Sequence, residues 1–161
     1  MPDIKPLPSD EWLTLRDIRL SALSDSPDAF LSTFALEESF TEDNWRAEFI
    51  RGSWSVGYAD GHPVCLVGIT REPDTPMDQC YLEYVWVARP FRHRGIAFAM
   101  LNEVLDQLKK SGVRTVFLWV LDGNDVAFRL YERVGFTRNN HLQPLAARPG
   151  RSEERLRLDL S

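Results

Sequence analysis

The stretch that decides the fold runs from residue 81 to residue 97 and has the sequence YLEYVWVARPFRHRGIA. Its first half, Tyr81–Val87, is a β-rich apolar run that only Glu83 interrupts with a charge. Its second half is basic, and a helical pattern begins there at about Arg94. The stretch therefore predicts a strand, a basic turn and a helix in succession.

The segments on either side of this stretch predict a mixed α/β sheet. Apolar residues recur with helical spacing from Ala97 to Leu108, which predicts a helix over about 94–111 that ends at Gly112. Further helices are expected from Ser9, from Thr41 to Gly52, and over 124–134. Strands are expected over 54–58, 64–70, 80–87, 115–121, 136–142 and 155–160. The turn Asp60-Gly61 is a hairpin signal, so the first two strands should be antiparallel, while the later strand–helix–strand order favours a mixed sheet.

The length and composition of the chain are those of one ordinary globular domain. With 161 residues, of which 43% are apolar and 27% charged, we expect a single domain over residues 1–161. The formal net charge of −5 argues against nucleic acid as the main partner, because duplex binding usually needs a basic excess. The longest apolar stretches, such as Val116–Leu121, are too short to span a bilayer, so no membrane partner is expected.

The two cysteines, Cys65 and Cys80, each lie inside an apolar run. They have no metal-ligand spacing, and two thiols do not make a disulfide framework. The N-terminus also lacks the basic-then-apolar order of a signal peptide. We therefore expect two buried thiols, no metal site and a cytoplasmic location.

The turn before the long helix predicts an anion site. A helix N-terminus normally has a Ser, Thr, Asp or Asn cap and acidic residues in its first turn, and this one has neither. Basic side chains precede it instead, and Gly95 lets the backbone approach a ligand closely. The basic residues are Arg89, Arg92, His93 and Arg94. Free amides, the helix dipole and guanidinium charge together suit a phosphate, although a basic solvated turn would have the same composition.

Two blocks of the sequence resemble motifs of a known family. The pattern Arg92-x-x-Gly95-x-Ala97, preceded by Val85-Trp86-Val87 and Pro90, is similar to the acyl-CoA pyrophosphate loop of the GNAT superfamily of N-acetyltransferases. A second block, Asn124-x-x-Ala127-x-x-Leu130-Tyr131-x-x-x-Gly135-Phe136, resembles that family's downstream strand–helix motif. The only departure is Ala97, where many members have a second glycine. The resemblance implies an α/β (α+β) fold with a mostly antiparallel central sheet, flanking helices and a splayed strand pair at the acyl-CoA site.

The resemblance also implies which residues bind the cosubstrate acetyl-CoA. Backbone amides from Arg94 to Ala97, with the side chains of Arg92 and Arg94, would hold the pyrophosphate. The strand Val85–Val87 would separate from its neighbour at a bulge, pair with the pantetheine arm, and place an amide near the acetyl carbonyl. Asn124 would bind the arm, cap its helix, or do both. The full set expected at acetyl-CoA is Val85, Trp86, Val87, Arg92, His93, Arg94, Gly95, Ile96, Ala97 and Asn124.

Two further residues are expected to take part in proton transfer. By the resemblance, Tyr131 would protonate the departing thiolate, since a thiol near pKa ~8.5 and a phenol near ~10 are close enough for the transfer. Without the resemblance, Tyr131 would be interpreted as a core aromatic. Glu83, a few residues before the thioester site, could take a proton from the amine directly or through water. The alternatives are that Glu83 faces solvent, or that a water chain serves as the base.

The resemblance also implies that the first two helices, their connecting loop and the last strands build the acceptor side. The loop at 24–30 and the pair Glu37-Glu38 form an acid-rich segment near Phe30, Phe34 and Phe40, which would suit a cationic amine with some apolar bulk. A solvated acidic loop over core phenylalanines would have the same sequence. The sequence does not identify the acceptor, and it leaves open whether the chain forms a homodimer.

The sequence is thus interpreted as an acetyl-CoA-dependent N-acetyltransferase. It would transfer the acetyl group to a primary amine, of a small molecule or of a peptide or protein, by direct attack in a ternary complex. The alternative is a non-catalytic acyl-CoA sensor or scaffold of the same fold, which would have no use for Tyr131 as an acid. A weaker third interpretation is a generic phosphate-binding α/β domain, which would bind ADP as well as it binds CoA.

Overall fold

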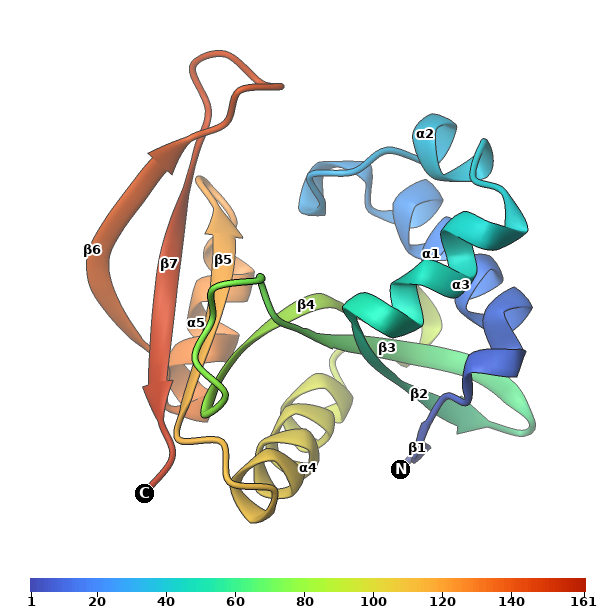
Figure 1. Ribbon diagram of the computed structural model, residues 1–161, viewed down its shortest axis with the longest axis horizontal. Coiled ribbons are helices and arrows are strands. Elements are labelled where there is room, and N and C mark those ends of the chain that lie inside the picture. Colours follow the sequence, from blue (N-terminus) through green and yellow to red (C-terminus); the bar gives the residue numbers. More distant parts are fainter.

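The computed structural model describes residues 1–161 and folds into a seven-stranded sheet with helices on both faces (Figure 1). The strands are β1 (Asp3–Pro6), β2 (Gly52–Ala59), β3 (His62–Thr70), β4 (Gln79–Val87), β5 (Thr115–Leu121), β6 (Thr137–Pro144) and β7 (Ser152–Asp159). The helices are α1 (Trp12–Asp25), α2 (Phe34–Glu38), α3 (Glu42–Arg51), α4 (Ile96–Lys110) and α5 (Asp125–Val134). The strand order is β1-β2-β3-β4-β5-β7-β6, and only β4 and β5 are parallel. The predicted mixed, mostly antiparallel sheet is confirmed.

Most predicted elements lie within three residues of their expected bounds. The hairpin at Asp60-Gly61 joins the antiparallel strands β2 and β3, as predicted. Helix α4 begins two residues later than expected, because Gly95 at its N-cap has the left-handed conformation, with φ of 75°. Strand β7 begins at Ser152, three residues earlier than expected, and β1 and α2 lie in segments for which no strand or helix was expected.

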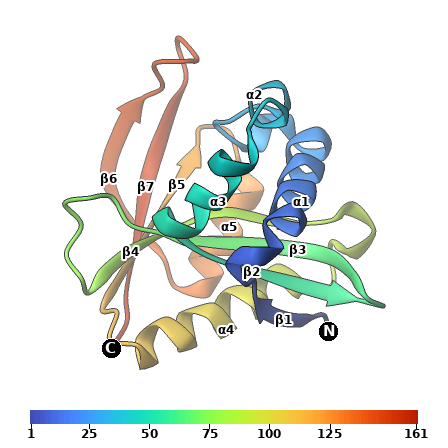
Figure 2. The same cartoon turned by 45° about the vertical axis from the view of Figure 1, so that its right-hand side comes forward.

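Two hydrophobic clusters lie on opposite faces of the sheet. The larger packs α4 and α5 against one face through residues such as Met100, Leu101 and Phe128. The smaller packs α1 and α3 against the other face around Trp45 and Trp54. Figure 2 shows α4 on one side of the strands and α1 and α3 on the other. None of the helices combines the length and the apolar character that a membrane span requires.

Strands β4 and β5 separate along their length. Their pairing covers three residue pairs and ends at Tyr81 and Phe117. From Leu82 to Val87, β4 therefore has no strand partner on this side. The splayed strand pair that the resemblance implied is confirmed.

A bulge in β4 accompanies this separation. Leu66 of β3 pairs with Trp86, whereas Gly68 pairs with Glu83, so β4 uses one more residue than β3 over the same length. Tyr84 lies inside this interval and has a positive φ of 54°, which is unusual for an aromatic residue. The extra residue reverses the alternation of side chains beyond Tyr84.

Candidate active site

A cavity of about 520 Å³ opens where β4 and β5 separate. On the α5 side it is lined by Asn124, Ala127 and Tyr131, and on the opposite side by Phe30 and Ser32 from the segment between α1 and α2. The cavity thus passes through the sheet, and a group held on one face can meet a group held on the other. No Lys, Arg or His lines it, and its charged lining residues are all acidic: Glu72, Glu83 and Glu153.

The bulge decides which side chains of β4 face each half of the cavity. In a regular strand Leu82 and Tyr84 would share one face. Instead, Leu82 belongs to the cluster under α4, whereas Tyr84 packs into the cluster under α1 and α3. Glu83 also points toward α3, where it meets Arg51. Glu83 and Tyr84, although they are neighbours in sequence, therefore both line the half of the cavity on the side of α1 and α3.

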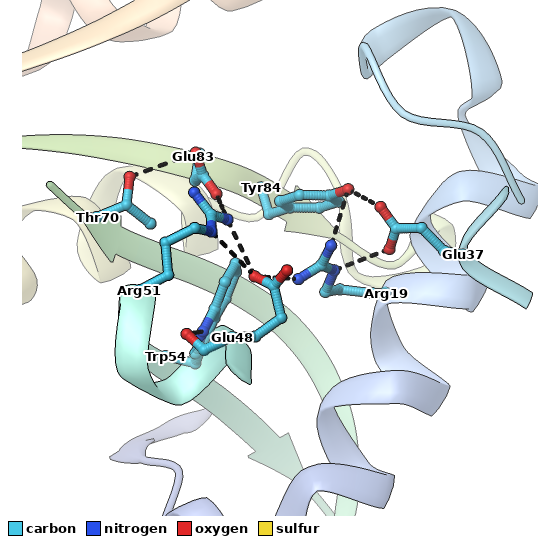
Figure 3. A network of polar contacts seen from close by, with 8 residues as sticks. All are labelled: Arg19, Glu37, Glu48, Arg51, Trp54, Thr70, Glu83 and Tyr84. Carbon is cyan, nitrogen blue, oxygen red and sulfur yellow. Dashed lines mark hydrogen bonds and ion pairs between the residues drawn. The ribbon is translucent and has the colours of Figure 1, made fainter. Parts of the chain in front are cut away.

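A buried polar network fixes Tyr84 in this position (Figure 3). Arg19 on α1 donates from Nη2 to the Tyr84 hydroxyl at 3.3 Å and from Nε to Glu37 Oε1 at 2.9 Å. The Tyr84 hydroxyl in turn donates to Glu37 Oε2. Burial raises the pKa of Tyr84, so the phenol keeps the proton that it donates. The bulge is thereby tied to both α1 and α2.

Glu83 lies in the cavity wall with each carboxylate oxygen bonded to one neighbour (Figure 3). Arg51 at the end of α3 donates to Oε1, and the Thr70 hydroxyl donates to Oε2 at 3.3 Å. Arg51 also pairs with Glu48 on its own helix at 3.0 Å. The side chain of Glu83 is 32% exposed, so it is neither fully open to solvent nor buried in the core. The guanidinium orients this carboxylate and offsets its charge.

The N-terminus of α4 has the features expected of an anion site. No side chain caps the helix, and no acidic residue lies in its first turn. Its first backbone amides therefore have no partner within the helix. A Cβ built on Gly95 would meet nothing within 4 Å, so the backbone there is open to a ligand.

The side chain of Arg92, which the resemblance placed at the pyrophosphate, makes its contacts within the chain. Its Nε donates to the Val87 carbonyl at 2.8 Å, and its Nη2 pairs with Asp25 at the end of α1. Burial alone would raise the pKa of Asp25, but hydrogen bonds, first from Ser26, and the charge of Arg92 outweigh it and lower that pKa. Arg89 pairs with the same carboxylate. Arg92 therefore anchors the loop to α1.

The three expected residues of β4 have different surroundings. Val85 lines the cavity. Trp86 is buried in the smaller cluster, and its indole N–H donates to Asp25 Oδ2 at 3.2 Å. Val87 is buried in the larger cluster. Beyond Val85, only backbone groups of this segment are available to a ligand in the gap.

The remaining loop residues surround the start of α4. His93 is exposed and has a positive φ of 61°. Arg94 is also exposed, and its guanidinium lies 5.5 Å from the centre of the Phe91 ring. Ile96 is buried in the larger cluster, and Ala97 packs against that cluster. Of the two arginine side chains expected at a phosphate, only that of Arg94 is free of an ion pair with an acidic residue.

Asn124 and Tyr131 meet at the α5 side of the cavity. Asn124 Oδ1 accepts from the amide of Ala127 at 3.3 Å, so its role as a helix cap is confirmed, and the residue also lines the cavity. Tyr131 is only 9% exposed, and its ring packs edge-on against Phe136. Its hydroxyl makes no hydrogen bond within the chain, and burial raises its pKa. The phenol is therefore a protonated donor without a partner.

Neither cysteine is part of this site. Cys65 and Cys80 are fully buried, and burial raises the pKa of each thiol to about 11. Neither lines the cavity. The expectation of two buried thiols is confirmed.

Two residues of the polar network, Arg19 and Arg51, were not predicted from the sequence. A third, Glu37, was expected in a different environment. Glu37 was expected at an acidic rim, but it is 1% exposed and paired with Arg19. The sequence did contain an indication that Arg19 is buried, because it lies four residues after Leu15 and three before Ala22, on the apolar face of its helix. No local pattern indicated the pairing of Arg51, since its partner Glu83 is 32 positions away.

The sequence comparisons identify the family. The family model described as the acetyltransferase (GNAT) family matches residues 14–136, which is more than half of the chain. The chain belongs to this family. The spore coat polysaccharide biosynthesis protein SpsD of Bacillus subtilis is 32% identical over 110 residues, which cover 68% of this chain and 37% of that protein. The [ribosomal protein bS18]-alanine N-acetyltransferase of Escherichia coli is 35% identical over 60 residues, 37% of this chain and 40% of that enzyme. The chain thus matches less than half of the length of these relatives.

Solved structures of the family share the fold over the full length. A GNAT-family acetyltransferase from Streptococcus pneumoniae superimposes with a TM-score of 0.83 at 16% identity, covering 100% of both chains. The PaiA N-acetyltransferase of Thermoplasma acidophilum, solved in complex with coenzyme A, gives a TM-score of 0.76 at 15% identity and covers 99% of both chains. At these identities the likeness concerns the fold.

Proposed function

We propose that the chain is an acetyl-CoA-dependent N-acetyltransferase that acts on a primary amine by direct attack in a ternary complex. The observation that carries the proposal is the cavity through the sheet, which joins Asn124 and Tyr131 on one face to Glu83 on the other. A sensor that only binds acyl-CoA would need the part of the cavity beside Asn124 and Tyr131, and it would not need the part beside Glu83. Membership of the GNAT family supports the same activity.

The residues at the two expected contact regions fit acetyl-CoA. The uncapped amides at the start of α4, together with the open approach at Gly95, suit the pyrophosphate. The unpaired edge of β4 from Leu82 to Val87 offers backbone donors and acceptors to the pantetheine arm. Arg94 would add a positive charge at the phosphates, whereas Arg92 would hold the loop in place. When bound, acetyl-CoA supplies an activated acetyl group.

The chain's own groups then serve three needs of the transfer. A backbone amide near Val85, at the bulge, would donate to the acetyl carbonyl oxygen as negative charge develops there. Glu83 would accept a proton from the amine, directly or through water. Tyr131 would donate its unpartnered phenol proton to the departing sulfur. Because both thiols are buried with raised pKa values, neither cysteine is suited to carry the acetyl group, which favours direct attack.

Titration of the purified chain with acetyl-CoA, with ADP as the control, tests the cosubstrate. We expect acetyl-CoA to bind more tightly than ADP, because only acetyl-CoA reaches the β4 edge. Gly95→Ala should weaken acetyl-CoA binding about tenfold, or about 1.4 kcal/mol, by placing a methyl group and strain at the phosphate-binding turn. Calorimetry measures both affinities directly.

The chain offers a matched control for this variant. Gly61 in the β2–β3 turn also has a positive φ, 78° against 75° for Gly95, and a Cβ there would likewise meet nothing within 4 Å. Gly61→Ala should therefore cause similar backbone strain, of about 1–2 kcal/mol, without affecting acetyl-CoA. Failure of the folded wild type to bind acetyl-CoA would overturn the proposal. Equal binding of ADP would favour a general phosphate site.

A further inference from the structure

Glu153 is a buried carboxylate in the cavity wall that has no cationic partner. It lies on β7 opposite Leu121 of β5, and it is only 4% exposed. Gln143 on β6 donates to Oε1, whereas Oε2 accepts no hydrogen bond within the chain. The side chain is therefore oriented by one amide and keeps a free oxygen at the cavity.

The basic residues that flank Glu153 along the chain make their contacts with other residues, although Nε of Arg155 is buried without a hydrogen-bond partner. Arg155 shares a strand face with it, but its Nη1 donates to the Tyr81 hydroxyl at 3.4 Å and its guanidinium lies 4.4 Å from the centre of the Phe117 ring. Arg151 pairs with Asp122. Neither forms an ion pair with Glu153. A buried charge without a partner costs free energy, which a positively charged ligand would offset.

The other two carboxylates of the cavity do not share this property. Glu72 is exposed to solvent, which stabilises its charge. Glu83 is paired with Arg51. No Lys, Arg or His lines the cavity, and Glu153 is the lining carboxylate that is both buried and without an ion pair.

Glu153 and Glu83 lie on different sides of the gap between the strands. Glu83 is on β4 and Glu153 is on β7, with β5 between them. Neighbouring strands lie about 4.8 Å apart, so two spacings separate these strands by roughly 10 Å, and the splay of β4 adds to this distance. Trp119 of β5 lines the cavity and offers an apolar surface along the way. A linear molecule with a charge at each end would fit this arrangement.

We propose that Glu153 binds a second ammonium group of the acceptor, so that the favoured substrates are linear diamines. One amine would react beside Glu83 and Tyr84 while the other pairs with Glu153. This inference rests on the proposed acetyl transfer and names the class of amine that the same cavity accepts.

Steady-state kinetics with two matched series of amines tests the inference. The probes are linear diaminoalkanes of about four to eight carbon atoms, a series whose lengths range from less than two strand spacings to slightly more, each compared with the unbranched monoamine of equal length. At the best length, we expect kcat/KM to be about tenfold higher for the diamine, which corresponds to about 1.4 kcal/mol. Glu153→Gln should bring this ratio close to one, mainly by raising KM for the diamine.

Glu154 provides the matched control. It is the next residue of β7, and it pairs with Arg138 at 3.4 Å outside the cavity. Glu154→Gln removes the same charge from the same strand and should leave the diamine preference intact. The ratio of diamine to monoamine in the wild type is itself a test that does not depend on whether a variant folds.

Each outcome decides between the alternatives. A ratio near one in the wild type, or a preference that persists in folded Glu153→Gln, would overturn the inference. Acetyl-CoA binding without acetylation of either amine series would overturn it as well. Absence of acetyl-CoA binding would instead overturn the proposed function, so the two failures are distinguishable.

Discussion

Arg19→Met is expected to lower the free energy of unfolding by about 3–5 kcal/mol, because it leaves a buried carboxylate without its counter-ion. Arg19 is 3% exposed and pairs with Glu37 and Glu48, each at 2.9 Å. Its guanidinium also lies over three aromatic rings, those of Trp45 at 4.9 Å, Trp54 at 5.0 Å and Tyr84 at 4.3 Å. Such a loss is a large part of the roughly 5–15 kcal/mol that stabilises a typical domain. Urea unfolding at neutral pH measures it.

Two companion variants separate the buried pair from an ordinary loss of charge. Arg46→Met removes an exposed pair with Glu42, at 2.8 Å, and should cost no more than about 1 kcal/mol. The double variant Arg19→Met with Glu37→Met should recover part of the loss, because both buried charges are then gone. If Arg19→Met is no more destabilising than Arg46→Met, the network does not hold the bulge as described.

The parts of the fold that the sequence predicted well are those with a strong local pattern. The apolar spacing from Ala97 to Leu108 identified α4, and Thr115 with the continuous apolar run that follows it, Val116–Leu121, identified β5 with its observed bounds. The hairpin at Asp60-Gly61 followed from turn chemistry alone. Strand β1 was missed because it has four residues, ends at Pro6 and pairs only at the sheet edge. Helix α2 was missed because five residues are too few to show a helical period.

The parts of the site that could not be predicted depend on contacts between distant residues. Arg92 and Asp25 are 67 positions apart, so no local pattern indicated that the arginine would anchor the loop to α1. Glu37 and Tyr84 are 47 positions apart, and the acidic composition around Glu37 suggested a solvated rim. Composition records which charges are present, whereas the fold decides which of them are paired. The expectation of a bulge came from the family pattern and not from residue spacing.

Tyr131→Phe is expected to reduce kcat by about 10²–10⁴-fold, the range for loss of a positioned general acid. The variant should change acetyl-CoA affinity and stability little, because the hydroxyl makes no hydrogen bond within the chain. Burial raises the pKa of Tyr131, and the protonated phenol is the form that donates. The pH at which the phenol ionises and can no longer donate is therefore higher than usual. The wild-type rate should therefore not fall between about pH 7 and pH 10 through ionisation of this group.

The measurement pairs kcat, followed by release of the CoA thiol, with acetyl-CoA affinity from calorimetry. Tyr58→Phe is the control, since Tyr58 is a β2 residue that does not line the cavity, and both quantities should stay unchanged there. A Tyr131→Phe enzyme with a kcat near that of the wild type would remove Tyr131 from the proposed mechanism and favour a water molecule as the acid. A wild type that binds acetyl-CoA but transfers it to no amine, peptide or protein would favour the sensor. Because the acid is required only for turnover, a loss of kcat with retained affinity distinguishes the enzyme from that alternative.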